Sequence, residues 1–176
     1  MVLLSTQTAS SSSTISFTSN IDSTYDKYVF KFYDIHPQTD SVTFYFNMSI
    51  DGGSNYNVTK TTTIFRTYHF EDDSGGVLAY DAGMDLAQST AIKGVGGSIG
   101  GDADQSLSGT MTLYAPSDTT FVKHFIGNST FINGGDGSYS WFTAGYGNTT
   151  SAVNAVQFSM NSGNIDAGVI KMYGVT

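Results

Sequence analysis

Alternating apolar and polar side chains limit the fold of this chain more than any other feature of its sequence. Val42, Phe44, Phe46, Met48 and Ile50 alternate with threonine, tyrosine, asparagine and serine. Successive side chains of a β-strand point to opposite faces, so this period of two predicts a strand with one side in a core. We therefore expect these five apolar residues to face the interior.

Similar segments recur along the whole chain and are closed by glycine, asparagine, aspartate or proline. About eleven short strands without intervening helices predict one antiparallel β-sandwich of jelly-roll type over residues 1–176. The best helix candidate, residues 81–92, is bracketed by glycines, which disfavour a helix. The glycine-rich residues 94–101 are expected to form a long loop. The other expected strands cover residues 3–8, 14–18, 28–33, 61–69, 77–80, 107–114, 119–130, 138–146, 155–161 and 165–173.

Charge and composition exclude several classes of function. Fifteen acidic residues and seven basic ones give a net charge of −8, which argues against nucleic acid and anionic lipid as partners. No segment has the roughly 18 apolar residues of a membrane-spanning helix, so no membrane insertion is expected. The lack of cysteine excludes disulfides and sulfur-ligated zinc. The first residues lack the basic start and apolar run of a secretory signal, which predicts synthesis in a cytoplasm.

The histidines and acidic residues offer no recognisable catalytic centre. The histidines are His36, His69 and His124, and no G-x-S-x-G elbow is present to expose a nucleophilic serine. A glycosidase needs two carboxylates across a cleft, but the acidic residues here fall mainly in turn clusters. We therefore expect structural histidines, no enzymatic activity and no cofactor.

Two acidic groups could supply oxygen ligands to calcium, which binds carboxylates and loop carbonyls. Asp102 and Asp104 lie in a glycine-rich segment, and Glu71 begins a run of three acidic residues. The spacing of an EF-hand loop is absent, and aspartate in loops commonly bonds to its own backbone. Ordinary turns are therefore the favoured interpretation and no metal is predicted, with Asp102 and Asp104 as the calcium candidates.

Aromatic and amide side chains concentrate between residues 136 and 148, which makes this segment the candidate glycan-binding site. The candidate residues are Tyr139, Trp141, Tyr146 and Asn148. Aromatic rings can stack on the C–H face of a sugar, and amides can bond its hydroxyls. Tyr139 and Trp141 share one face of a strand, so both lie either in the core or on the surface. The core is favoured for these two, because a sandwich interior needs aromatic residues.

Six segments carry a resemblance to a known group of proteins. They are residues 30–37 (FKFYDIHP), 51–63 (DGGSNYNVTKTTT), 85–90 (DLAQST), 120–125 (TFVKHF), 144–150 (AGYGNTT) and 162–174 (SGNIDAGVIKMYG). Together they resemble short, mostly uncharacterised virion structural proteins of marine tailed bacteriophages, including phages of cyanobacteria. The resemblance runs from end to end, and the closing segment is its most distinctive part.

That resemblance implies a structural protein of a bacteriophage particle, made in the cytoplasm of the bacterial host and carried on the virion surface. A compact domain suits a capsid decoration (cement or knob) protein, with glycan adhesion as an added role. A receptor-binding tip or tail-fibre-associated adhesin is the alternative. The partners would be the major capsid protein, or a tail or fibre protein, and a host surface glycan. By analogy with phage decoration and tip proteins we expect a homotrimer, with residues 1–8 contacting a neighbour.

Overall fold

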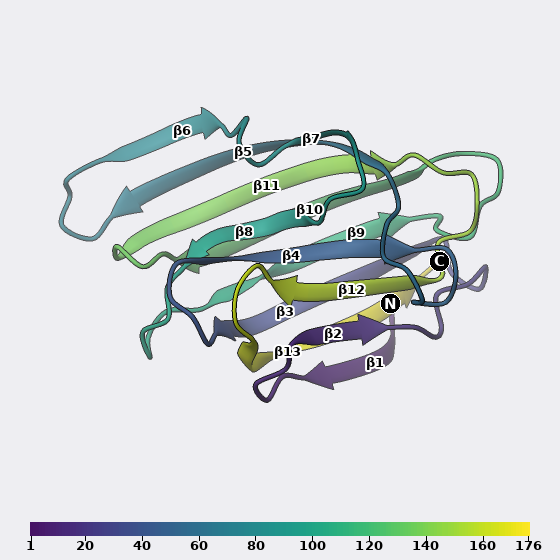
Figure 1. Ribbon diagram of the computed structural model, residues 1–176, viewed down its shortest axis with the longest axis horizontal. Coiled ribbons are helices and arrows are strands. Elements are labelled where there is room, and N and C mark those ends of the chain that lie inside the picture. Colours follow the sequence, from purple (N-terminus) through teal and green to yellow (C-terminus); the bar gives the residue numbers. More distant parts are fainter.

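The computed structural model describes residues 1–176 as two antiparallel β-sheets joined by turns and loops (Figure 1). The strands are β1 (Val2–Thr8), β2 (Thr14–Phe17), β3 (Lys27–Pro37), β4 (Val42–Ser49), β5 (Lys60–Phe70), β6 (Gly76–Tyr80), β7 (Leu86–Ser89), β8 (Lys93–Ile99), β9 (Leu107–Tyr114), β10 (Lys123–Ile132), β11 (Gly137–Gly147), β12 (Ala155–Met160) and β13 (Ile165–Val175). The prediction of an all-β, antiparallel fold is confirmed. None of the chain forms a helix long and apolar enough to cross a membrane.

The two sheets differ in size and lie face to face. The nine-stranded sheet has the order β1-β13-β3-β9-β10-β11-β5-β6, and β7 pairs with β5 beside this path. The four-stranded sheet has the order β2-β12-β4-β8 and lies in front of the larger sheet in Figure 1. The larger sheet therefore has one face against the smaller sheet and the other face free.

Aromatic side chains from both sheets fill the space between them. Phe32 of β3 packs edge-on against Phe44 of β4, with ring centroids 5.4 Å apart. Phe46 of β4 packs in the same way against Phe125 of β10, at 4.9 Å. Edge-to-face aromatic pairs add to the stabilisation that burial itself provides. These contacts join the sheets through one hydrophobic core.

Strand β4 has the predicted orientation except at its end. The four buried residues of the expected set are Val42, Phe44, Phe46 and Met48. Ile50 was also expected to face the core, but it lies beyond β4 and is 42% exposed. A turn begins here, because the Ser49 hydroxyl donates to Asp51 Oδ1 at 2.6 Å and that oxygen accepts the Asn55 N–H at 2.9 Å. The alternation of a strand does not continue through a turn.

The glycine-rich segment that was expected to be a long loop is instead the buried strand β8. Its backbone pairs with β4, and it packs directly on the inner side chains of the larger sheet. A Cβ atom at Gly97 would collide with the Trp141 ring, and one at Gly96 with Leu107. Glycine is therefore needed where the backbone of one sheet approaches large side chains of the other.

Residues 81–92 contain a turn and a short strand, in agreement with the glycines that disfavour a helix there. The turn is closed by the Met84 N–H, which donates to the carbonyl of Asp81 at 3.1 Å. Strand β7 follows and pairs with β5. The segment thus extends the larger sheet.

Candidate functional site

The four residues predicted as a glycan site do not meet on one surface. Tyr139 and Trp141 of β11 point between the sheets, and Trp141 is only 2% exposed. Tyr139 stacks between Tyr68 and Phe131, with centroid distances of 4.7 and 5.4 Å. These two aromatic residues thus lie in the core, the location that the sequence favoured, and a ligand in solvent cannot reach them.

Tyr146 and Asn148 belong to a polar surface cluster at the end of β11. Gln88 Nε2 donates to Thr61 Oγ1 at 2.7 Å and to the Tyr146 hydroxyl at 3.3 Å. Asn148 Nδ2 donates to Gln88 Oε1 at 2.7 Å. These bonds fasten β7 to β5 and to the end of β11, so the cluster has a structural role.

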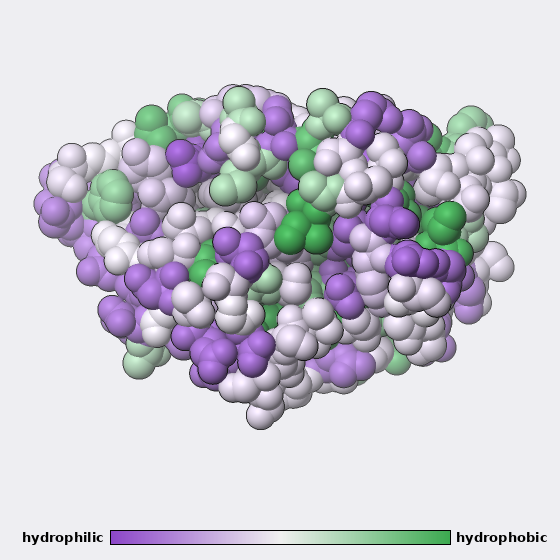
Figure 2. All heavy atoms as spheres, viewed as in Figure 1, coloured by the Kyte–Doolittle hydropathy of each residue, from purple (hydrophilic) through white to green (hydrophobic).

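The outer faces of the two sheets differ in chemistry. On the four-stranded sheet, Gln157 donates to Ser16 at 3.0 Å, and Figure 2 shows this side of the molecule with only scattered hydrophobic patches. The nine-stranded sheet instead exposes the large side chains of Phe65, Leu78, Tyr80, Ile126 and Phe142. Apolar side chains gathered on one exposed face commonly mark a binding surface. The outer face of the nine-stranded sheet is therefore the candidate site.

Phe65 of β5 and Phe142 of β11 form the centre of this face. They lie opposite each other in register, and their rings stack with centroids 4.8 Å apart and planes 8° from parallel. Phe65 is 45% exposed and Phe142 is 38% exposed. Phe142 directly follows Trp141, and neighbouring residues of a strand point to opposite faces. The same strand thus supplies a core indole and an exposed phenyl ring.

A groove of about 360 Å³ runs beside the stacked pair. Phe65, Phe142 and Ile126 line it, and the small side chain of Ala144, opposite Ile126, keeps it open. Ligand sites commonly combine such an apolar lining with a few polar groups that fix orientation. Asn128 is one of the polar groups at this groove.

Lysine and tyrosine occupy the part of the outer face formed by β3 and β13. Lys31 and Lys171 lie directly opposite each other in register. Lys31 Nζ is 5.2 Å from the centre of the Tyr173 ring, and Lys171 Nζ is 5.4 Å from the centre of the Tyr33 ring. These are cation–π contacts, which hold an ammonium group over an aromatic face.

One row of outward side chains connects the aromatic part of the face to the lysines. Across successive strands the row contains Tyr80, Phe65, Phe142, Asn128, Thr110, Lys31, Lys171 and Thr6. The row has no carboxylate of its own, and at its β6 end the Tyr80 hydroxyl donates to Asp85 Oδ2 at 2.5 Å. The face therefore offers aromatic, amide, hydroxyl and ammonium groups in sequence.

The three histidines lie in separate places, each beside a different residue. His36 Nε2 lies 3.2 Å from the Asp102 carbonyl oxygen, and His36 Nδ1 lies 3.8 Å from Asp166 Oδ2. His69 Nε2 lies 3.2 Å from Asp73 Oδ1, and the His124 and Tyr146 ring centroids are 6.1 Å apart. The His69 contact is local, whereas His36 and His124 contact residues of neighbouring elements, and no histidine lies beside another.

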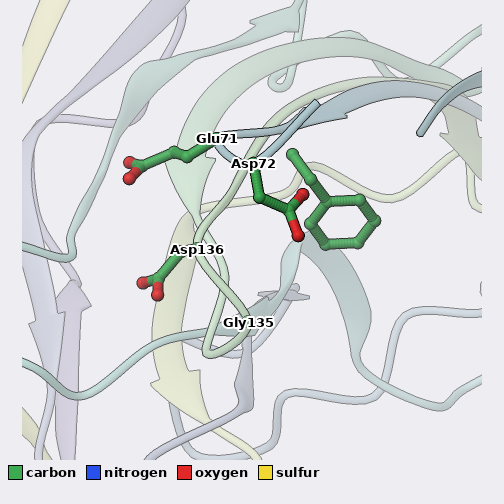
Figure 3. Close-up of a pocket in the computed structure, with 5 residues that line it drawn as sticks. Glu71, Asp72, Gly135 and Asp136 are labelled. Atoms are coloured by element: carbon green, nitrogen blue, oxygen red, sulfur yellow. The ribbon is translucent and has the colours of Figure 1, made fainter. Parts of the chain in front are cut away.

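An acidic pocket of about 390 Å³ lies where the β5–β6 and β10–β11 turns meet. Figure 3 shows the Glu71 and Asp136 carboxylates pointing to one side and that of Asp72 to the other. Asp136 Oδ1 accepts a hydrogen bond from Gln105 Nε2 at 2.9 Å. Hydrogen bonds from Ser74 hold the pKa of Asp72 below its ordinary value. Asp72 and Asp136 thus stabilise turns, and the three carboxylates do not converge on one point.

The calcium candidates Asp102 and Asp104 lie in the turn between β8 and β9. The Gln105 N–H donates to the Asp102 carbonyl at 2.9 Å, and the Asp102 N–H donates to Gln105 Oε1 at 3.1 Å. Asp102 thus shapes a turn, as aspartate in loops commonly does. No three histidine, aspartate or glutamate side chains come together in the chain in a way that could hold a metal ion.

Comparison with protein-family models, with curated proteins and with solved structures found no match for this chain. The candidate site therefore rests on the geometry of the chain itself.

Sequence reasoning missed the residues that form this site, although a signal for one of them was present. Trp141 and Phe142 are adjacent in a strand, so only one of them can face the core. The alternation that places Tyr139 and Trp141 in the core also places Phe142 on the opposite side of the same strand. For Phe65, Ile126 and the two lysines, only the register between strands shows that they share a face.

Proposed function

We propose that the chain is a structural protein of a bacteriophage particle, most simply a capsid decoration protein, that adheres to a host glycan through its nine-stranded sheet. The observation that carries this proposal is the exposed Phe65–Phe142 stack with an open groove beside it. Exposed aromatic rings beside an open groove suit the C–H face of a sugar ring. The resemblance to virion proteins of marine phages supplies the biological setting.

The strand order supports a jelly-roll assignment for the fold. In a jelly roll with strands lettered B to I, the two sheets have the orders B-I-D-G and C-H-E-F. The four-stranded sheet fits the first order, with β2, β12, β4 and β8 in those places. In the larger sheet β3, β5 and β6 take the places of C, E and F, and the β9–β10–β11 meander stands in place of H. Jelly rolls occur in viral capsid and lectin domains, which suits both parts of the proposal.

We further propose a homotrimer in which β1 contacts a neighbouring copy. Strand β1 is an edge strand and pairs only with β13. It carries no charge, and Val2 and Leu3 are exposed. Uncharged edges with free backbone groups readily pair with another chain. Light scattering at micromolar concentration should give the mass of a trimer, and a monomer mass there and in the virion-bound protein would contradict this arrangement.

A receptor-binding tip or tail-fibre adhesin is the second candidate, and the exposed aromatic face favours it equally. Copy number separates the two, because decoration places a protein at the many equivalent positions of a capsid shell. Gel densitometry of purified virions against the major capsid protein should show an abundant band, with antibody labelling on capsids. A scarce band with labelling on tails would identify an adhesin. A chain missing from virions would contradict both.

Adsorption tests whether the outer face is the adhesive surface. Virions that carry Phe65→Ser with Phe142→Ser should adsorb more slowly to host cells at an unchanged copy number of the protein. Phe121→Ser is the matched control, because Phe121 is 70% exposed and lies before β10, outside the groove. Unchanged adsorption of the double variant would show that this face does not bind the host.

A further inference from the structure

Lys31 and Lys171 form an unfavourable pair that the fold leaves unneutralised. They are directly opposite each other on adjacent strands, and like charges in that arrangement destabilise a sheet. Arg66 with Asp81 is the one ion pair formed by a lysine or arginine of the chain, so neither Lys31 nor Lys171 has a carboxylate partner. The chain has fifteen acidic residues and only seven basic ones, yet no carboxylate lies beside these two lysines in their row.

The positive charges of the chain are distributed unevenly. Lys60, Lys93 and Lys123 are fully buried, and Arg66 forms an ion pair with Asp81 at 3.3 Å. The basic residues that remain are Lys27, Lys31 and Lys171. All three lie on the outer face of the nine-stranded sheet, because Tyr28, Phe30 and Met172, which alternate with them, point into the core. The accessible cations therefore share the face that carries the groove.

The tyrosines keep the two ammonium groups in place without satisfying their hydrogen bonds. Tyr173 and Tyr33 offer ring faces at 5.2 and 5.4 Å, which attract a cation but accept no conventional hydrogen bond from it. Each ammonium has three N–H donors. The pair is thus positioned to donate to an anionic group placed between or above the two strands.

The spacing between the aromatic and cationic parts suits an extended ligand. Phe142 and Lys31 are separated by β10 and β9 in the row, so they lie about 14 Å apart at the usual strand spacing of about 4.8 Å. Asn128 and Thr110 fill the positions between them and can bond hydroxyl groups. A short run of linked sugar rings covers such a distance, whereas a single small ion does not.

We propose that the outer face binds an anionic polysaccharide, with sugar rings against the Phe65–Phe142 groove and a carboxylate, sulfate or phosphate substituent at Lys31 and Lys171. The inference rests on the proposed adhesive function and names its ligand class. An ammonium group is a compact positive charge that can donate hydrogen bonds to any of these three oxyanions. The charge of the ligand fits this face and not the chain as a whole: the net charge is −8, but Lys31 and Lys171 lie here without a carboxylate partner.

Calorimetric titration of the purified chain tests this inference with five probes: dextran sulfate, unsubstituted dextran, oligogalacturonate, a neutral malto-oligosaccharide of equal length, and inorganic phosphate. At least one anionic polymer should bind ten-fold or more tightly than its neutral counterpart and than phosphate. Added salt should weaken that binding, because it screens exposed charges. Equal binding of charged and neutral polymers, or binding of neither, would overturn the anionic ligand class. Phosphate binding as tight as that of the polymers would show a simple ion site and would also overturn it.

Two double variants show whether the lysines are responsible. Lys31→Gln with Lys171→Gln should weaken binding of the anionic polymer ten-fold or more. Ser54→Asp with Ser162→Asp lowers the net charge equally in exposed turns away from this face and should change binding less than three-fold. Equal losses in both would assign the effect to overall charge and contradict the inference. The lysine variants could bind the anionic polymer normally while virions with Phe65→Ser and Phe142→Ser adsorb slowly. That result would support the adhesive function and contradict only the anionic ligand class.

Discussion

Three lysines lie between the two sheets, and three others lie on the outer face of the larger sheet. The inner three are the first residues of β5, β8 and β10, and each reaches oxygen acceptors in neighbouring loops or strands. Their closest contacts are Lys60 Nζ to Asn47 Oδ1 at 2.6 Å, Lys93 Nζ to the Met84 carbonyl at 2.6 Å and Lys123 Nζ to the Phe121 carbonyl at 2.6 Å. The outer lysines Lys31 and Lys171 have only aromatic rings beside them.

The difference follows from what surrounds each ammonium group. Removal from water lowers the pKa of Lys60 and of Lys93 to about 8, although Asp85 and Asp81 partly oppose this at Lys93. Carbonyl and amide oxygens replace the lost water, so the inner lysines fix the loops in which those oxygens lie. The outer ammonium groups lie beside tyrosine rings and have no carbonyl, amide or carboxylate oxygen as a partner. One residue type therefore holds the fold together on one side of the sheet and stays available for a ligand on the other.

The largest expected contrast is between Trp141 and its neighbour Phe142. Trp141→Ala should lower the free energy of unfolding by about 3–5 kcal/mol, because it removes a fully packed core ring. Phe142→Ala should lower it by less than about 1 kcal/mol, since that ring is partly exposed. Urea denaturation measures both. Similar losses for the two variants would mean that the two faces of β11 are not energetically distinct.

A smaller loss is expected where the smaller sheet approaches the Trp141 ring. Gly97→Ala should destabilise the chain by about 1–3 kcal/mol, because its new methyl group would overlap that ring. Gly75→Ala is the control, since a Cβ there meets nothing within 4 Å. Thermal unfolding of the two variants side by side measures the difference. Equal stability would show that the core yields easily at β8.

The pH dependence of stability should distinguish an inner lysine from an outer one. With a pKa of about 8 in the folded chain and 10.5 in the unfolded one, Lys60 loses its proton first in the folded state. Raising the pH between these values therefore increases the free energy of unfolding by on the order of 1–3 kcal/mol. Below about pH 8 Lys60 is protonated in both states, so it adds no pH dependence to stability there.

Urea denaturation from about pH 7 to about pH 10 should show a smaller rise for Lys60→Met than for the natural chain. Lys31→Met, the matched outer variant, should keep the full rise. Parallel curves for the natural chain and Lys60→Met would contradict the low pKa of the buried ammonium group.

The smallest effect is expected at Lys31 itself. Lys31→Gln removes repulsion from Lys171 but also the contact with Tyr173, and these effects oppose each other. The free energy of unfolding should therefore change by less than about 0.5 kcal/mol. A loss of more than about 1 kcal/mol in urea denaturation would assign Lys31 a structural role like that of the inner lysines.

Most strands were predictable because one face of each lies in the core, which gives the sequence an alternation of apolar and polar residues. The segment from residue 107 to residue 114 coincides with β9. The prediction failed at β8, because glycine there serves close packing against Trp141 and Leu107 and not chain flexibility. The prediction that Ile50 faces the core was wrong, because β4 ends at Ser49 and a hydrogen-bonded turn follows it.

The candidate site was much less predictable than the fold. Trp141 and Tyr139 lie in the core as predicted, but the sequence prediction did not include the exposed ring of Phe142. Its partner Phe65 is far away in the sequence and becomes its neighbour only through the pairing of β5 with β11. Likewise the two lysines of the candidate site become opposed only through the pairing of β3 with β13.

The sequence by itself determined that the chain forms antiparallel β-sheets with an aromatic core. A period of two, turn-forming residues between strands and the scarcity of helix-forming segments are local properties, and local properties can be read in order along the chain. The tertiary structure alone decided which outward residues share a face, that β8 is a strand, and that three lysines are buried. Those features depend on register and sheet packing between distant segments, which no single stretch of sequence contains.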